Sequence, residues 1–116
     1  MGRLQFQKGY PKIVKMASGH LSLELSGQVS FNGFPDYAEL FLSTVGGILK
    51  ERNDSIIMCI WEVVINDCRY RLVYDDYPLG VFLESDNDRS DGELSRIKKM
   101  LEAVSLPPSG DNQGDE

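Results

Sequence analysis

The stretch that decides the fold of this chain is IIMCIWEVVINDCRYRLVYDDYPLGVFL, residues 56–83. β-Branched and aromatic residues dominate it, which is typical of strands rather than helices. Two turn signals, Asn66-Asp67 and the Pro-Leu-Gly run at residues 78–80, divide the stretch into three segments. Consecutive strands joined by short turns pair antiparallel, so the stretch predicts a β-meander at the centre of a sheet.

The first strand of this meander is Ile56–Ile65, which is apolar on both of its alternating faces apart from Glu62. Strands of this kind lie in the middle of a sheet and are covered on both sides. We therefore expect a central strand with Trp61 in the core. The last strand, Val81–Glu84, is short and contains no lysine or proline that blocks pairing, so we expect it at an edge of the sheet.

Before the meander, apolar residues occupy odd positions between residues 21 and 31. They are Leu21, Leu23, Leu25, Val29 and Phe31. The alternation predicts one long, half-buried strand that bends at a bulge at Gly27. A hairpin that turns at Ser26-Gly27 is the alternative. We prefer the bent strand because the alternation continues across the glycine.

A helix is predicted from Pro35 to Val45, where apolar residues follow helical spacing. Proline suits the first turn of a helix, and the Gly-Gly pair at residues 46–47 suits its end. The next segment, Ile48–Arg52, is predicted as a short strand that leads into the meander.

A second amphipathic helix is predicted after the meander. Ser90 and Glu93 have the spacing of a capping box, which marks a helix start. Apolar residues at helical spacing then continue to Ser105, and two prolines follow at residues 107–108.

The predicted order of elements is β-α-β-β-β-β-α. Two amphipathic helices with one apolar face each fit best against one face of an antiparallel sheet, so the class is α+β with about five strands. Residues 20–105 are expected to form one domain. Residues 1–19 stay poorly defined, although Leu4, Phe6 and Ile13-Val14 allow a short strand. The acidic tail, residues 106–116, is expected to be disordered.

The charge of the chain is acidic and unevenly distributed. The whole chain carries −6, and residues 1–15 contain four basic residues and no acid, so the remainder carries −10. An acidic body repels phosphates and disfavours a nucleic-acid partner, whereas it suits a basic protein partner. No apolar run approaches the ~20 residues of a membrane span. Without an export signal, and with Cys59 and Cys68 expected as free thiols, the sequence indicates the cytoplasm.

Candidate binding residues cluster in the second half of the meander. Arg69 and Arg71 share one strand face and have the spacing to hold a phosphate or carboxylate, or to pair across the sheet with Glu62 or Glu84. Adjacent acids follow at Asp75 and Asp76, beside Tyr74, although neighbouring strand residues point to opposite faces.

Other chemistry is poorly supported by the sequence. His20 is the single histidine, and without a His/Cys cluster we expect no metal and no cofactor. Asp86, Asp88, Asp91 and Glu93 lack the central glycine and the spaced glutamate of a calcium loop, and we interpret them as a helix cap in a solvated loop. No residue pattern indicates a catalytic centre.

Two stretches resemble a known family. Phe34–Leu42, FPDYAELFL, resembles the motif that opens the helix in a family of small acidic bacterial proteins, domain of unknown function 3630. Trp61, Cys68-Arg69, Tyr74–Tyr77 and Val81–Glu84 are similar to its meander. The similarity covers roughly residues 20–85. It implies a one-domain bacterial cytoplasmic protein and carries no assigned activity.

Two functions remain in competition. The first is a non-enzymatic protein-interaction module that works as an immunity protein, an adaptor or a chaperone-like binder. The second is a small-molecule-binding protein or enzyme with a cleft beside the sheet around Arg69, Arg71, Tyr74 and Asp75. Protein partners fit the first, among them a second copy paired through the edge strand Val81–Glu84. A monomer with that edge covered by Leu4–Phe6 is the alternative to the dimer.

Overall fold

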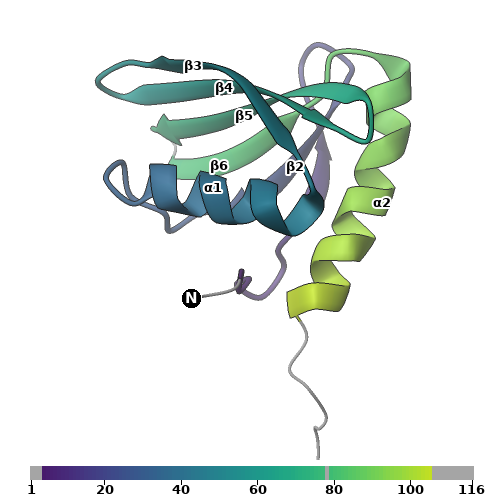
Figure 1. The fold of residues 1–116 in the computed structure, drawn as a ribbon, viewed down its shortest axis with the longest axis horizontal. Coiled ribbons are helices and arrows are strands. Elements are labelled where there is room, and N and C mark those ends of the chain that lie inside the picture. The colour runs from purple at the N-terminus through teal and green to yellow at the C-terminus, as the bar shows by residue number, and fades with distance from the viewer. Residues whose placement is uncertain (1–3, 78, 106–116) are drawn as a thin grey trace, which may run out of the picture.

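The computed structural model describes residues 4–77 and 79–105 and shows one antiparallel sheet with two helices (Figure 1). The elements in chain order are β1 (Lys12–Lys15), β2 (Leu21–Ser26), α1 (Phe34–Val45), β3 (Ile48–Asp54), β4 (Met58–Ile65), β5 (Cys68–Asp76), β6 (Leu79–Glu84) and α2 (Asp88–Ser105). The α+β class is confirmed, with six strands rather than five. The additional strand is β1, which pairs with β2 through Ile13 and Leu23. The expected tail, residues 106–116, lies outside the described residues.

The meander forms as the turn residues predict. Asn66 and Asp67 both have positive φ angles, 52° and 64°, which a two-residue hairpin turn requires. The resulting register places Cys68 opposite Ile65, whereas Cys59 lies opposite Tyr74. The two cysteines therefore belong to different cross-strand pairs, and both are buried free thiols.

The order of strands across the sheet is β1-β2-β6-β5-β4-β3. The prediction that Val81–Glu84 forms an edge is therefore wrong, because β6 is paired with β2 on one side and with β5 on the other. The true edges are β1 and β3. Charged residues and a bulge near Glu51 protect β3, and β1 is only four residues long.

The prediction of a central strand covered on both faces is also wrong. The strand β4 begins at Met58 and lies beside the edge strand β3, while Ile56 and Ile57 are exposed in the preceding turn. Its buried and half-buried residues alternate, because both helices pack on the same face of the sheet. Apolar residues on an uncovered face give the same sequence pattern as residues on a covered one.

The long bent strand is the third correction. The strand β2 ends at Ser26, and its bulge falls between Glu24 and Ser26 rather than at Gly27. The backbone N–H of Gly27 instead donates to Gln7 Oε1 at 3.1 Å. Val29 packs against the core from a loop, so the apolar alternation continues without a strand.

The helices begin and end at identifiable residues. Gly46 ends α1 in the left-handed conformation at φ 70°, as predicted. The helix α2 begins at Asp88, two residues before the predicted start, because the Asn87 side chain caps it by accepting from Ser90 N at 2.8 Å. Within the described residues, no helix is long and apolar enough to cross a membrane.

The core lies between the helices and one face of the sheet. Trp61 is completely buried there, which confirms its predicted place. Phe34 of α1 contacts the Trp61 ring edge-on at 5.3 Å and lies 5.6 Å from the Tyr74 ring, measured between ring centroids. Before β1, Leu4 is buried in the same core and Phe6 packs against it.

Candidate binding face of the sheet

The face of the sheet opposite both helices carries no helix in the described part of the chain, and we call it the open face. The pairing registers place these residues on it: Val14, Ser22, Glu24, Met58, Ile60, Glu62, Val64, Arg69, Arg71, Val73, Asp75, Phe82 and Glu84. One cross-strand row of this face is apolar. Phe82, Val73 and Ile60 lie side by side on three neighbouring strands, and we call this row the apolar strip.

The Phe82 ring leans over Gly80, two residues earlier on the same strand. A Cβ atom at Gly80 would lie only 2.5 Å from the ring, so the glycine leaves room for the ring above its own backbone. The ring therefore lies against its own strand rather than pointing away from the sheet.

A shallow groove of about 490 Å³ runs across the open face from β1 to β4. Its floor includes the apolar strip, and the whole lining is Val14, Lys15, Met16, Ala17, Ser22, Glu24, Met58, Ile60, Val73, Asp75, Phe82 and Glu84. The lining holds three carboxylates, Glu24, Asp75 and Glu84, against the single ammonium of Lys15. The groove therefore combines apolar surface with excess negative charge.

Two polar groups of the groove are poorly satisfied. Ser22 Oγ is buried and has no hydrogen-bond partner among the described residues, an arrangement that costs about 1–3 kcal/mol. Burial raises the pKa of Glu84 above its usual value, and the nearby Arg71 offsets this only in part. Ser22 and Glu84 are cross-strand neighbours on the same face.

A second hollow, of about 340 Å³, lies beside the groove on the same face, and we call it the charged hollow. It is lined by Glu62, Arg69, Tyr70, Arg71, Glu84, Asp86 and Asn87. Arg71 is paired in register with Glu62 on one side and Glu84 on the other, and its Nε atom lies 4.0 Å from Glu84 Oε1. The expected cross-strand pairing of Arg71 with Glu84 is therefore present, and three acids line the same hollow as the two arginines.

The structure separates the candidate residues of the predicted cleft. Arg69 and Arg71 line the charged hollow, and Asp75 lines the groove, where its Oδ1 accepts from Tyr77 N at 3.0 Å. Tyr74 lies on the opposite face, completely buried, and its hydroxyl donates to Asp76 Oδ1 at 2.9 Å. The alternation of side chains along β5 therefore keeps Tyr74 and Asp76 away from the two arginines.

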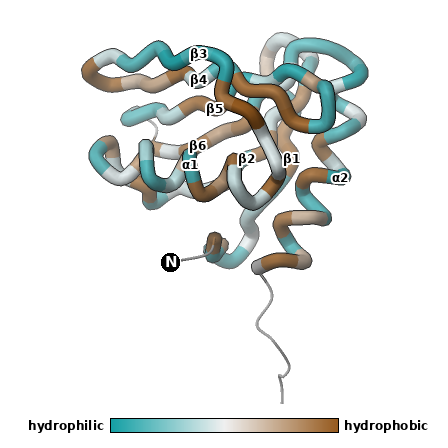
Figure 2. Tube along the Cα trace, viewed as in Figure 1, coloured by the Kyte–Doolittle hydropathy of each residue, from teal (hydrophilic) through white to brown (hydrophobic). Residues whose placement is uncertain are grey.

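Beyond one end of the open face, two neighbouring turns expose large apolar side chains. Ile56 and Ile57, in the turn between β3 and β4, are 89% and 59% exposed, and Tyr77 after β5 is 92% exposed. The two turns are joined by a hydrogen bond from Asp76 N to Ile57 O at 3.1 Å. We call Ile56, Ile57, Tyr77 and Leu79 the tip. The hydrophobic turn of the β3–β4 hairpin is brown in Figure 2.

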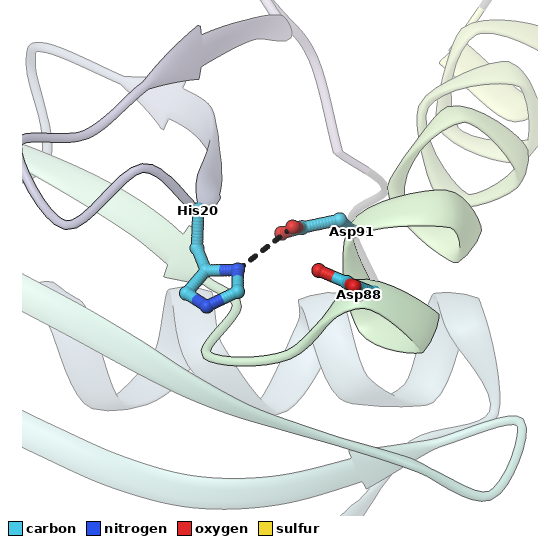
Figure 3. A group of neighbouring side chains, drawn as sticks. All are labelled: His20, Asp88 and Asp91. Atoms are coloured by element: carbon cyan, nitrogen blue, oxygen red, sulfur yellow. Dashed lines mark hydrogen bonds and ion pairs between the residues drawn. The ribbon is translucent and has the colours of Figure 1, made fainter.

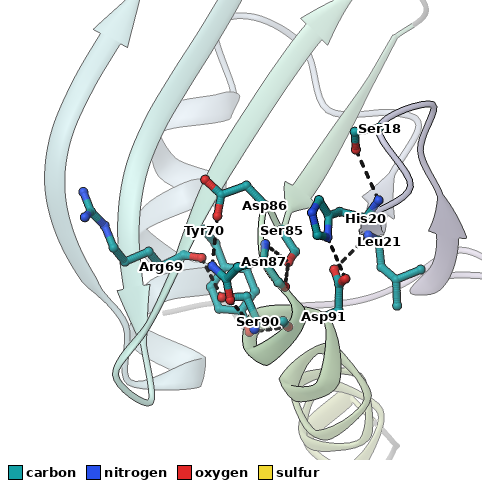
Figure 4. A network of polar contacts seen from close by, with 10 residues as sticks. All are labelled: Ser18, His20, Leu21, Arg69, Tyr70, Ser85, Asp86, Asn87, Ser90 and Asp91. Atoms are coloured by element: carbon teal, nitrogen blue, oxygen red, sulfur yellow. Dashed lines mark hydrogen bonds and ion pairs between the residues drawn. The ribbon is translucent and has the colours of Figure 1, made fainter.

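At the other end of the sheet, a polar network fastens α2 to two strands, β2 and β5 (Figure 4). The Asp91 carboxylate accepts from Leu21 N at 2.9 Å and lies 2.8 Å from His20 Nδ1. The Tyr70 hydroxyl donates to Ser90 O at 3.0 Å, and Ser90 Oγ donates to Arg69 O at the same distance. We call this network the clamp, because it fixes the first turn of α2.

Comparison with known proteins identifies the family. A family model described as protein of unknown function (DUF3630) matches residues 12–102. The chain belongs to this family. The match begins at the first residue of β1 and extends into the last turns of α2, beyond the stretch on which the sequence resemblance rests. No significant match is found among curated proteins or among solved structures.

The DUF3630 region includes the whole clamp, and one part of it has the composition of a metal site. Ligand atoms of His20, Asp88 and Asp91 lie within 4.8 Å of one another, as Figure 3 shows. No local sequence pattern reveals this group, because 71 positions separate His20 from Asp91. Asp88 and Asp91 stand in the first turn of α2, where the positive end of the helix attracts acids and disfavours a cation. We therefore interpret the group as an ion-pair clamp.

The His20–Asp91 pair predicts a defined pH dependence. The hydrogen bond to Asp91 raises the pKa of His20 above 6.5. Burial alone would raise the pKa of Asp91, but the hydrogen bonds from His20 and Leu21 outweigh it and hold that pKa below 3.8. The histidine contribution to stability is complete below pH 6.5 and is lost as the pH rises through the folded pKa. The Asp91 contribution exists above pH 3.8 and is lost as the pH falls through the lowered pKa.

We expect the stability difference between wild type and His20→Gln to be largest between about pH 4 and 6.5. Because the chain has one histidine, its NMR titration reports His20 alone. Asp91→Asn should return the midpoint toward 6.5, whereas Asp88→Asn should shift it less, because Asp88 acts only through its charge. A wild-type midpoint at or below 6.5 would contradict this account.

Proposed function

We propose that this DUF3630 protein is a non-enzymatic protein-interaction module that binds a partner protein through the open face and the tip. The observation that carries the proposal is the apolar strip of Phe82, Val73 and Ile60 on a sheet face that no described helix covers. Phe82 and Ile60 are only half-buried there, on either side of the buried Val73, and partly exposed apolar surface with a polar rim is typical of protein-binding sites.

The chemistry of the described residues supports binding over catalysis. Glu62, Glu84 and Asp86 line the charged hollow together with the two arginines, so their negative charge competes with any anionic ligand. Burial raises the pKa of the Cys59 thiol to about 11, so the thiolate needed for nucleophilic attack is scarce at neutral pH.

A bacterial cytoplasm is the setting that we propose, and an immunity protein, an adaptor or a chaperone-like binder is the role. The sequence resemblance supports a bacterial origin. Two buried free thiols suit a reducing compartment, and the net charge of −6 disfavours nucleic acid as the partner.

The test is partner capture with a surface variant and a matched control. Immobilised wild-type protein, Ile57→Thr/Ile60→Thr and Ile48→Thr/Leu49→Thr are compared in a lysate of the source organism. Both double variants replace exposed or half-exposed apolar residues of strands or turns, but only the first changes the tip and the apolar strip. We expect a protein that wild type and the β3 control retain and that Ile57→Thr/Ile60→Thr loses.

Two results would oppose the proposal. One is a protein that all three forms retain equally, and the other is no protein above the level of a blank support. Capture of small molecules in the charged hollow, abolished by Arg69→Gln/Arg71→Gln, would instead support the alternative of a small-molecule-binding protein around Arg69, Arg71 and Asp75.

We expect the isolated protein to be a monomer. Pairing through Val81–Glu84 is impossible while β6 is flanked on both sides, and the actual edge β3 carries Lys50, Glu51 and Arg52. Sedimentation velocity should give one species near 13.0 kDa at all micromolar concentrations. A species of twice that mass that grows with concentration would show self-association.

A further inference from the structure

We propose that the groove binds a lysine side chain of the partner protein, with apolar residues beside it, and that Glu84 and Ser22 hold its ammonium group. This inference rests on the proposed function, because it names the chemistry of the segment that the open face receives.

Glu84 is the carboxylate of the groove with the weakest internal pairing. Glu24 forms an ion pair with Lys12 at 3.6 Å, and Asp75 accepts a backbone hydrogen bond. Among the described residues, Glu84 has an ion pair only with Arg71, at 4.0 Å, although its side chain is largely covered. A half-buried carboxylate with so little compensation gains most from an added cation.

Ser22 gives an independent indication of a ligand. Its hydroxyl is buried in the lining of the groove without a partner among the described residues, although its cross-strand neighbour is Glu84. Directly opposite residues in an antiparallel pair have Cβ atoms about 5 Å apart. An ammonium group has three donors, so it can donate to the Glu84 carboxylate and to Ser22 Oγ at once.

The apolar floor defines the neighbours of that lysine. Phe82, Val73, Ile60 and Met58 extend from Glu84 across three strands, and the Phe82 ring leans along its own strand over Gly80. The methylene stem of a lysine packs on such a surface while its charge stays at the rim. The side chains that flank the lysine in the partner segment are then apolar.

Charge excludes two other occupants. A second copy stacked on this face would bring its own Glu24, Asp75 and Glu84 against the same three carboxylates. Residues 106–116 contain three acids and no base, so they are repelled as well. A cationic segment of a different protein is the occupant that complements the groove.

The experiment compares two blocked heptapeptides by NMR titration of the full-length protein. One has a central lysine between valine and leucine, and the other has norleucine in place of the lysine. We expect the lysine peptide to bind roughly fivefold more tightly and to shift the amides of β2, β6 and β5.

Protein variants then locate the cation. Glu84→Gln should remove the preference for lysine, and Ser22→Ala should reduce it roughly twofold. Glu62→Gln is the matched control, because Glu62 also neighbours Arg71 on the open face but does not line the groove. It should leave the preference unchanged.

The outcomes separate this inference from the proposed function. Equal binding of both peptides at the apolar strip overturns the lysine site and leaves the interaction face intact. A preference for the lysine peptide that survives Glu84→Gln would show that only the net charge of the protein attracts the peptide. Amide shifts confined to β3 would show the same. Either result also overturns the lysine site. If neither peptide shifts the groove at millimolar concentration, the inference fails, while the capture experiment still decides the proposed function.

Discussion

Replacement of Trp61 by alanine should lower the free energy of unfolding by about 3–5 kcal/mol. The indole is completely buried against Phe34, and Arg52 covers the ring with its guanidinium carbon 4.4 Å from the ring centroid. The indole Nε1 donates to Asp54 Oδ1 at 3.1 Å. The substitution therefore leaves a cavity in the core and removes the hydrogen bond that ties the ring to β3.

Urea denaturation measures this loss directly, with Ile56→Ala as the matched control. Ile56 is an exposed apolar residue five positions earlier, so its truncation should change stability by less than about 0.5 kcal/mol. Trp61→Phe should cost less than Trp61→Ala, because an aromatic ring still packs against Phe34. A loss below about 1 kcal/mol for Trp61→Ala would mean that the indole is not part of the core.

Replacement of Ile97 by alanine should cost about 2–5 kcal/mol. Ile97 is completely buried where α2 packs on the sheet, between Leu94 and Leu101 of the same helix. Removing its branched side chain leaves a cavity between α2 and the sheet. Because the clamp fixes the first turn of α2, the helix cannot shift to fill that cavity. Thermal or urea unfolding measures the effect.

Lys99→Ala is the control for Ile97, because Lys99 is exposed on the other side of the same helix. Its substitution should change stability by less than about 0.5 kcal/mol. If the two variants unfolded alike, α2 would not be packed as the structure shows, and the covered and open faces of the sheet would have to be reassigned.

Local signals in the sequence identify the elements and their turns. Asn66-Asp67 marks a hairpin because both residues tolerate positive φ, and Gly46 marks the end of α1 for the same reason. Pairing between distant segments leaves no such signal. The place of β6 depends on β2, which joins it from roughly 60 positions earlier in the chain, so the sequence alone predicts Val81–Glu84 as an edge.

The candidate site is predictable where it depends on local sequence and not where it depends on contacts between distant segments. Alternation along a strand places Arg69 and Arg71 together on one face, and it also indicates that Tyr74 lies on the opposite face. Which face the helices leave uncovered cannot be read from β4, because both of its faces are apolar. The contact between His20 and Asp91 likewise depends on how α2 returns to the start of β2.

The place of β2 beside β6 has a consequence for the order in which the chain folds. The strands β3 to β6 follow one another through short connections, so their pairing closes only small loops and forms early. Ser22 can meet Glu84 only after most of the chain has been ordered between them. We therefore expect the β1–β2 hairpin to dock on β6 after the meander has formed and to separate from β6 before the meander unfolds. Because that hairpin forms one wall of the groove, its opening also opens the binding face.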